Sequence, residues 1–267
     1  MSSPPSPTRG TAIAVSTPDA IYVRDHDLVE DLLGRIDFTS MIFLHLRGRR
    51  PEPGELAVVN SVLVAVMEHG LTPSSITARL IYGSAPEALQ GAVAAGLLGA
   101  GSVFLGSMEE AARILQTGVR RIASGDVTAR EYCAEAITSR VEAGMTVPGF
   151  GHHIHRPDDP RSPRLLQIAR EQQVPTAHAE LLGTLSEVMD EIKGRHVTVN
   201  ATGAVAAVLS DIGFPWSDIR GFALIARAAG LVGHLSEDHE SPLGMDIWKL
   251  VEDGVPYTGT AGRGDVA

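Results

Sequence analysis

Residues 147–163 read VPGFGHHIHRPDDPRSP, and this stretch differs in composition from everything around it. Its four prolines and two glycines predict a loop with fixed turns. The glycines flank Phe150, so the backbone there can approach a ligand closely. Arg156 and Arg161 supply planar cationic donors suited to phosphate or carboxylate groups. The stretch predicts a binding loop; a surface loop whose histidines have no function is the alternative.

Outward from this loop, the chain reads as a series of helices. Apolar residues recur every three or four positions over residues 53–68. Residues 88–98 are nearly all small or apolar, which is typical of a helix buried on every side. Prolines 73 and 86 stand where helices are expected to begin. Further helices are predicted at residues 25–34, 38–46, 107–115, 128–143, 165–173, 177–192, 203–212, 218–231 and 245–252. Only residues 21–24 alternate as a short strand would, so the pattern predicts an all-α fold.

Length and composition narrow the class of protein. The 267 residues, 44% hydrophobic and 20% charged, suffice for one large domain or two small ones. A net charge of -10 argues against a broad nucleic-acid-binding face. A single cysteine, Cys133, excludes a disulfide framework and a cysteine-based zinc cluster. No apolar run is long enough for a membrane span, and the N-terminus lacks the pattern of a secretory signal. We therefore expect a cytoplasmic protein without membrane or nucleic-acid partners, with a mobile tail at residues 1–20 and a helical domain at residues 21–267.

Polar residues that interrupt the apolar helices are the candidates for chemistry. His69 follows the helix over residues 53–68, where a histidine is often only a favourable partner of the helix dipole. Thr202 lies where a helix begins, and simple capping would explain it. Arg227 stands alone in an apolar stretch and should pair with a buried acid or a ligand, and His234 has the same ambiguity. The three histidines of the loop also suggest a metal, but His152 and His153 are adjacent and the helical spacing of a zinc motif is absent.

Several of these segments together resemble the citrate synthase superfamily. Residues 147–152, followed by Arg156 and by Asp-Pro-Arg at 159–161, look like the signature loop of that superfamily. Glu68-His69-Gly70, Asn200-Ala201-Thr202-Gly203 and the Arg-containing helix that ends near His234 resemble its other motifs, in the same order along residues 20 to 255. The resemblance is strongest to citryl-CoA lyase and to the citryl-CoA lyase domain of ATP citrate lyase.

The resemblance implies an all-helical homodimer, or a higher homo-oligomer, with large and small domains and an active site between them. It implies an acyl-CoA substrate, no metal and no cofactor other than the coenzyme A thioester. By resemblance the catalytic residues are His69, His152 and Thr202, and the substrate-binding residues are Arg161, Arg227 and His234. The coenzyme A site would be formed by Val147, Pro148, Gly149, Phe150, Gly151 and Arg156.

Three departures from the family pattern bear on the reaction. Leu105 stands where citrate synthases carry a histidine that assists acetyl-CoA enolisation. Thr202 replaces the aspartate that handles the acetyl proton, and Glu109 and Glu110 are candidate substitute bases. Residues 237–240 are acidic where a basic cluster for citrate carboxylates is expected, which favours a less charged substrate.

The sequence thus predicts a carbon–carbon lyase that cleaves citryl-CoA or a related β-hydroxyacyl-CoA by retro-Claisen chemistry. A condensing acyltransferase of the synthase type and a non-catalytic paralogue that binds CoA esters are the alternatives.

Overall fold

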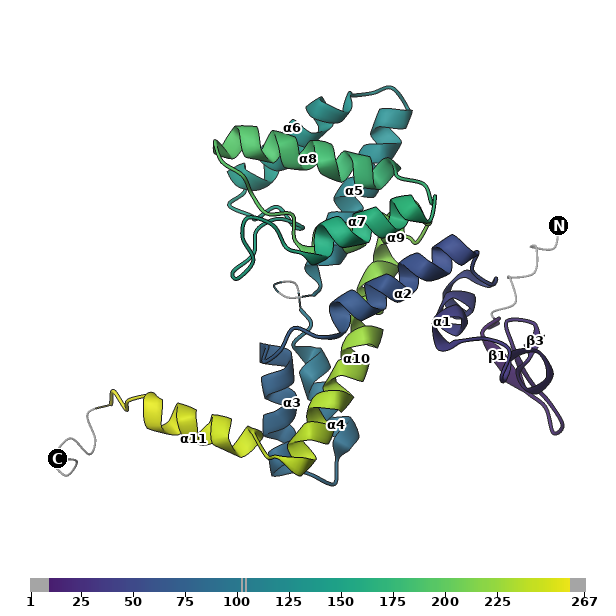
Figure 1. Cartoon of the computed structure of the whole chain (residues 1–267), viewed down its shortest axis with the longest axis vertical. Coiled ribbons are helices and arrows are strands. Elements are labelled where there is room, and N and C mark those ends of the chain that lie inside the picture. Colours follow the sequence, from purple (N-terminus) through teal and green to yellow (C-terminus); the bar gives the residue numbers. More distant parts are fainter. Residues whose placement is uncertain (1–9, 102, 104, 260–267) are drawn as a thin grey trace, which may run out of the picture.

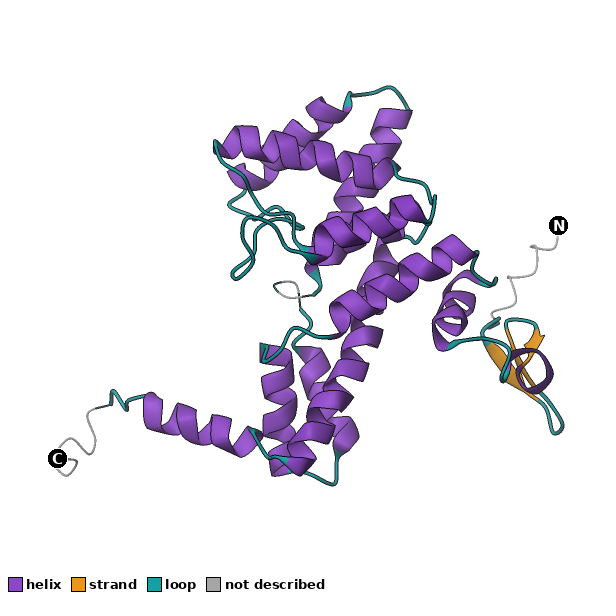
Figure 2. Cartoon of the chain, viewed as in Figure 1, coloured by secondary structure: helices purple, strands orange, loops and turns teal. Residues whose placement is uncertain are grey.

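The computed structural model describes residues 10–101, 103 and 105–259, and almost all of its regular structure is helical (Figures 1 and 2). This confirms the all-α prediction. The elements run in the order β1 Ala14–Ser16, β2 Ile21–Val23, β3 His26–Asp27, the π-helix η1 Leu28–Leu32, α1 Phe38–Arg47, α2 Pro53–Met67, α3 Pro73–Ser84, α4 Leu89–Leu98, α5 Ser107–Ala123, α6 Ala129–Glu142, α7 Arg161–Glu171, α8 Ala177–Lys193, α9 Ala201–Asp211, α10 Trp216–Glu240 and α11 Gly244–Gly254. None of the helices in this described part combines the length and apolar character needed to cross a membrane.

Helix α9 lies at the centre of the main hydrophobic core. Its sequence is almost entirely small or apolar, and every residue from Gly203 to Asp211 is buried. It packs against α5, α7 and α8, whose apolar faces surround it. A helix that is apolar all round is stable only when other helices cover every side of it. Its N-terminus, which carries Thr202, is therefore held firmly by the core.

Helix α10 joins this core to a second, smaller one. Near its N-terminal end, Ile219 and Phe222 pack in the main core. Farther along, Leu231 and Leu235 pack with Ala78 of α3 and with α4 in a separate cluster. Figure 1 shows α10 running from beside α9, past α2, down to α3 and α4. Arg227 lies between the two clusters.

The N-terminal region differs from the prediction. Strands β1, β2 and β3 form a small antiparallel sheet in the order β1-β2-β3. The strand expected at residues 21–24 is thus present. Strand β1, however, lies inside the segment that was expected to be a mobile tail, residues 1–20. Residues 1–9 of that segment fall outside the described part. The helix expected at residues 25–34 is wrong, because residues 26–27 pair with β2 and only residues 28–32 coil, behind an Asp27 cap. A third apolar cluster of Val23, Leu32 and Leu44 holds this region on α1.

Several helix limits also differ from the sequence pattern. The helix expected to end near residue 115 continues to Ala123, since its apolar face goes on packing against α6 and α8. Helix α10 likewise runs to Glu240 rather than 231, because Leu235 and Asp238 remain buried against α3. Helix α4 begins at Leu89, after a turn that follows Pro86.

Candidate active site

The loop over residues 147–160 is held against the N-terminus of α9. Glycine is required on both sides of this contact: a Cβ on Gly149 would lie 2.9 Å from the Cα of Gly203, and one on Gly203 would lie 2.8 Å from the oxygen of Gly149. The backbones also exchange hydrogen bonds, because the Asn200 amide donates to the Gly149 oxygen at 3.0 Å and the Gly151 amide donates to the Thr198 oxygen at 2.7 Å. The Asn200 side chain donates to the Gly151 oxygen at 2.8 Å. The glycines were expected to let the loop backbone approach a ligand closely. In the structure they let it approach the N-terminus of α9 closely.

His69 and His152 face each other across this site. Their rings are nearly parallel, with centroids 5.4 Å apart. His69 lies two positions after the end of α2, and His152 belongs to the loop, so two segments far apart in the sequence bring them together. The Nε2 atom of His69 is buried and has no hydrogen-bond partner among the described residues. The pair that the sequence predicted by resemblance therefore exists as a pair, and its catalytic role stays a prediction.

The hydrogen bonds of His152 fix which of its nitrogens carries the proton. Its Nδ1 accepts from the amides of Ile154 at 3.1 Å and His155 at 3.0 Å. An acceptor has no proton, so in the neutral ring Nε2 is the N–H and serves as a donor. Burial, reinforced by the neighbouring His155, lowers the pKa of His152 and favours this neutral form.

A metal would require a different arrangement of the same atoms. His69, His152 and His155 each offer a ligand atom, and these atoms lie within 4.8 Å of one another. Coordination through Nε2 of His152 would need its proton on Nδ1, where two backbone amides already donate. The cluster therefore suits a hydrogen-bond donor at His152 better than a metal ligand.

Asp159 ties Arg161 to both the loop and α9. The carboxylate is fully buried and accepts from the guanidinium of Arg161 at 2.8 and 3.0 Å. It also accepts from the Ala201 amide at 3.0 Å, and it lies 4.0 Å from Nε2 of His152. Burial alone would raise the pKa of Asp159, but these hydrogen bonds lower it to about 2. Asp159 thus orients Arg161 beside His152 as a permanent carboxylate.

Arg227 is a buried cation whose hydrogen-bonding capacity is largely unused. Its side chain is 4% exposed, and its Nε and Nη1 atoms have no hydrogen-bond partner among the described residues. Burial lowers the pKa of this guanidinium, which Glu68 opposes from 3.8 Å. Glu68 also binds Nε2 of His234 at 2.9 Å. His234 is therefore linked to Arg227 through a carboxylate, and Arg227 has donors left for an anionic ligand.

The acidic run over residues 237–240 has a structural partner that the sequence did not reveal. Arg79 of α3 is 1% exposed and binds Asp238 at 2.7 Å, Glu237, and Nδ1 of His234. Asp238 also accepts from the amides of Leu243 and Gly244 at the start of α11. Glu237 and Asp238 therefore join α10 to α3, and Asp238 also joins both helices to α11.

The two candidate substitute bases are occupied elsewhere. Glu109 pairs with Arg220 at 2.8 Å, and Glu110 pairs with Arg113 at 2.9 Å.

Thr202 is half-buried in the first turn of α9, directly after the residue that binds Asp159. Leu105 is half-buried with a positive φ of 59° and packs against the main core.

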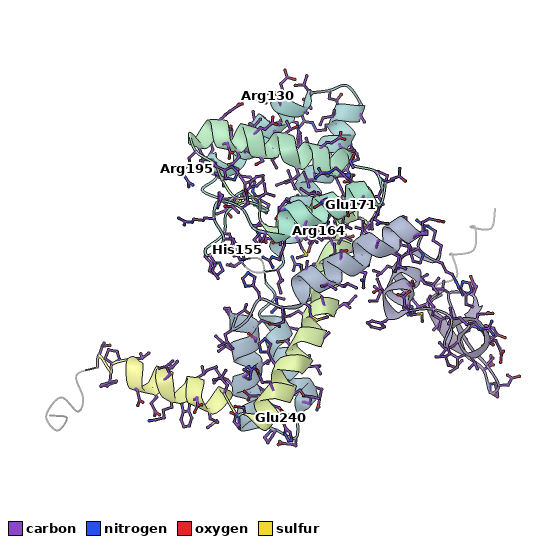
Figure 3. All side chains as sticks on the ribbon, viewed as in Figure 1. Arg130, His155, Arg164, Glu171, Arg195 and Glu240 are labelled. Carbon is purple, nitrogen blue, oxygen red and sulfur yellow. The ribbon has the colours of Figure 1, made fainter. Side chains whose placement is uncertain are left out.

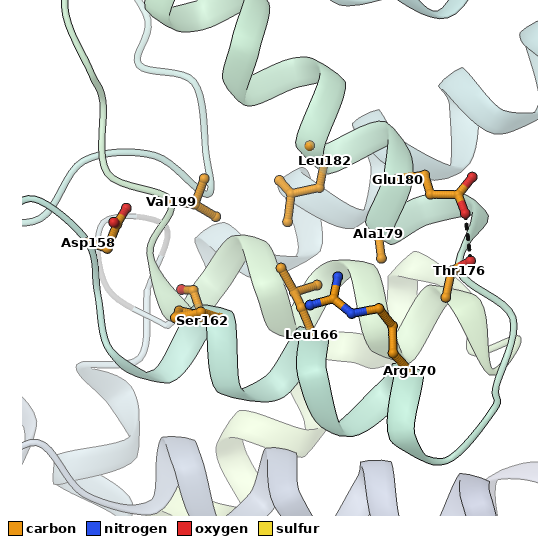
Figure 4. Close-up of a pocket in the computed structure, with 11 residues that line it drawn as sticks. Asp158, Ser162, Leu166, Arg170, Thr176, Ala179, Glu180, Leu182 and Val199 are labelled. Atoms are coloured by element: carbon orange, nitrogen blue, oxygen red, sulfur yellow. Dashed lines mark hydrogen bonds between the residues drawn. The ribbon is translucent and has the colours of Figure 1, made fainter.

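Two cavities flank the loop. One, of about 320 Å³, is lined by Gly151 and Arg156 of the predicted coenzyme A site, but not by Val147, Pro148, Gly149 or Phe150, and also by His152, Arg195 and His196 (Arg195 is labelled in Figure 3). The coenzyme A assignment stays a prediction. The other, of about 580 Å³, lies between α7 and α8 and contains none of the predicted site residues (Figure 4). It is lined by Asp158, Ser162, Pro163, Leu166, Arg170, Thr176, Ala179, Glu180, Leu182, Gly183 and Val199.

Sequence reasoning missed several residues of this site. Asp159 and Glu68 appeared only as parts of motifs, although they position Arg161, Arg227 and His234. Arg195 gave a signal that could have been used, since it lies in a basic stretch, residues 193–196, shortly before Asn200. His155 was visible only as one of three loop histidines.

Comparisons with known proteins agree with this architecture. The family model "Citrate synthase, C-terminal domain" matches residues 15–248. A protein of Mycobacterium tuberculosis named "Putative citrate synthase 2" is 27% identical over 218 residues, covering 80% of this chain and 54% of that protein. The chain spans about half the length of such curated relatives.

Solved structures of lyases also match. The structure of citryl-CoA lyase from Hydrogenobacter thermophilus superposes with a TM-score of 0.84 at 32% identity, covering 96% of both chains. ATP citrate lyase from Methanothrix soehngenii, solved with citrate and coenzyme A, has a TM-score of 0.76 at 20% identity, covering 100% of this chain and 44% of that one. The family match over most of the chain and this shared fold identify the chain as a member of the citrate synthase family.

Proposed function

We propose that the protein is a carbon–carbon lyase that cleaves citryl-CoA, or a related β-hydroxyacyl-CoA, to an acyl-CoA and an oxo acid. The observation that carries the proposal is the pairing of His69 with His152 at a centroid distance of 5.4 Å, beside a loop that is similar to the family's coenzyme A loop. Arg161 and the underused Arg227 supply cationic donors for a substrate carboxylate.

The two histidines suit different parts of a retro-Claisen reaction. The Nε2 of His69, which has no hydrogen-bond partner among the described residues, is available to take the proton of the substrate hydroxyl. The resulting alkoxide becomes the carbonyl of the oxo acid as the carbon–carbon bond breaks. The Nε2–H of His152, fixed by the two amides on its Nδ1, donates to this oxygen while it carries charge. The bond electrons pass to the thioester enolate, which is then protonated on carbon.

Two features favour cleavage over condensation. Leu105 offers no proton-transfer group at the position where, by resemblance, a synthase uses histidine to enolise acetyl-CoA. The likeness to the Hydrogenobacter lyase, at 32% identity and a TM-score of 0.84, is the second feature. Glu68, 3.8 Å from Arg227, offsets part of the positive charge, which favours substrates with fewer carboxylates than citryl-CoA.

Coenzyme A fits the smaller cavity by charge. Arg156 and Arg195 line it together with the glycine backbone at 151. Guanidinium groups bind phosphate oxygens in bidentate geometry. We propose that the phosphates of the CoA ester lie here, with the thioester directed toward His152. The homodimer implied by the family resemblance is a further prediction, which light scattering of the purified chain tests.

The purified full-length chain is assayed with citryl-CoA and with β-hydroxyacyl-CoAs that carry one or two carboxylates. Chromatography follows the acyl-CoA product, and a dinitrophenylhydrazine reagent detects the oxo acid. We expect turnover with at least one ester, and a loss of about 10²- to 10⁴-fold in His152→Ala. Acetyl-CoA with oxaloacetate, and a thiol reagent for free CoA, measures the synthase alternative. Binding of the esters without turnover in either direction would contradict the proposal and favour the non-catalytic alternative, as would unchanged turnover in His152→Ala.

A further inference from the structure

Of the acidic side chains described around the histidine pair, none is left free to protonate the enolate carbon. Thr202 carries a hydroxyl where the family carries a carboxylate, and a hydroxyl is a poor acid or base at neutral pH. Asp159 is held as a carboxylate by Arg161 and the Ala201 amide. Glu68 is bound to His234 and faces Arg227. These acidic groups are therefore committed to positioning other side chains.

His155 remains as a titratable group beside the reacting pair. Its ring centroid lies 4.4 Å from that of His152 and 5.6 Å from that of His69. One nitrogen of each of the three rings lies within 4.8 Å of the others. The His155 side chain is half-buried, and Figure 3 shows it on the loop beside the region where α2 ends. It is thus close enough to share a substrate with both histidines.

We infer that His155 is the catalytic acid that replaces the missing carboxylate, an assignment that rests on the proposed lyase function. His69 takes the hydroxyl proton, the carbon–carbon bond breaks, and its electron pair forms the enolate. Protonated His155 then gives its proton to the enolate carbon, forming the new C–H bond and leaving the imidazole neutral. The proton on His69 returns to His155 through solvent or through the cluster, so charge and protons balance over one turnover.

The backbone amide of His155 contributes to the site independently of the side chain. Its amide is one of the two donors that hold Nδ1 of His152. Substituting the side chain with Asn keeps this amide and so keeps the hydrogen bond to His152. Loss of activity in His155→Asn would therefore report on the imidazole rather than on the orientation of His152.

His153 provides a matched control in the same loop. Its ring lies 4.8 Å from that of His152 but 6.2 Å from that of His69, its side chain is exposed, and it is not part of the three-nitrogen cluster. His153→Asn makes the same chemical change two positions away. If the charge or composition of the loop alone determined activity, the two variants would lose activity to the same extent.

The test compares wild type, His155→Asn and His153→Asn with the ester that the wild-type protein cleaves. We expect His155→Asn to lose at least about a hundredfold in kcat with KM changed by less than about threefold, and His153→Asn to stay within about threefold of wild type in both. A second readout is deuterium incorporation from D₂O into the methyl group of acetyl-CoA in the presence of the oxo acid, which should disappear with His155→Asn. Adding Thr202→Asp to His155→Asn should return about tenfold or more of the lost kcat, since it restores a carboxylate at the family position.

The outcomes separate this inference from the proposed function. If the wild type cleaves no ester, the proposed function fails and the inference fails with it. If the wild type is active and His155→Asn retains full kcat and deuterium exchange, only the inference is overturned. Equal losses in His155→Asn and His153→Asn, or a loss confined to KM, would also overturn it, because a general acid acts on kcat.

Discussion

Replacing Asp159 with Asn removes a carboxylate on which Arg161 and the N-terminus of α9 both depend. The side chain is fully buried and accepts from the Arg161 guanidinium, the Arg161 amide and the Ala201 amide. Asn has nearly the same volume but only one acceptor oxygen and no charge. We therefore expect Asp159→Asn to fold with the same core and a lower free energy of unfolding.

The expected magnitude follows from the pKa of Asp159. These contacts lower the pKa from its usual 3.8 to about 2. Each pKa unit corresponds to about 1.4 kcal/mol, so the charged form contributes about 2 kcal/mol to stability. Because the folded-state pKa lies below the unfolded one, this contribution is complete above about pH 4 and is lost as the pH falls through about 2. The difference between wild type and variant should be constant from pH 7 to about 4 and narrow below that.

Urea unfolding followed by circular dichroism measures this difference. With an m-value of about 3 kcal/mol per molar urea, 2 kcal/mol lowers the midpoint by about 0.7 M. The neighbouring Asp158 is the control, because its side chain is 56% exposed and, among the described residues, pairs only with the exposed imidazole of His196. Asp158→Asn should therefore stay within about 0.5 kcal/mol of wild type. Equal midpoint shifts for the two variants, or a difference that does not narrow in acid, would refute the reasoning.

Three further predictions concern other buried features. Arg79→Met leaves Asp238 buried without its cation and should lower the free energy of unfolding by about 3–5 kcal/mol, and a loss under about 1 kcal/mol in urea unfolding would contradict this. Gly203→Ala places a Cβ 2.8 Å from the Gly149 oxygen and should lower the free energy of unfolding by about 1–3 kcal/mol. Gly183→Ala, which has open space around it in a helix, should be neutral or stabilising by up to about 1 kcal/mol. If Gly183→Ala lowered the thermal unfolding midpoint more than Gly203→Ala, the close contact at Gly203 would be excluded. Cys133 is buried, which raises the pKa of its thiol to about 11, so a thiol reagent at pH 8 should react with it only after urea is added, and rapid reaction of the folded protein would show that the site opens.

The helices could be predicted from the sequence because each buries an apolar face whose spacing is local. The same reasoning failed at residues 25–34, where strands of two or three residues are too short to show an alternating pattern. It also did not reveal the structural partner of the acidic run near residue 238. The reason is physical: the cation that neutralises Asp238 is Arg79, 159 positions away, and no local pattern records that pairing.

Several residues of the candidate site could be predicted from the sequence, but the contacts that connect them could not. Motif order supplied His69, His152 and Arg161 by resemblance. That Asp159 also binds the Ala201 amide, or that Glu68 lies between Arg227 and His234, depends on contacts between segments far apart in the sequence. The missing carboxylate at Thr202 was visible in the sequence, whereas His155 became a candidate only through its ring distances to His69 and His152.

The burial of α9 has a consequence for which substitutions can alter turnover. No face of this helix is free to shift without displacing α5, α7 or α8. Its first turn holds the loop that carries two of the three clustered imidazoles. We therefore expect a smaller side chain at Val208, which is fully buried in the main core, to shift the first turn of α9 and the loop that packs on it. Random mutagenesis scored by activity should therefore find sensitive positions along the entire length of α9, including positions that do not contact the ligand.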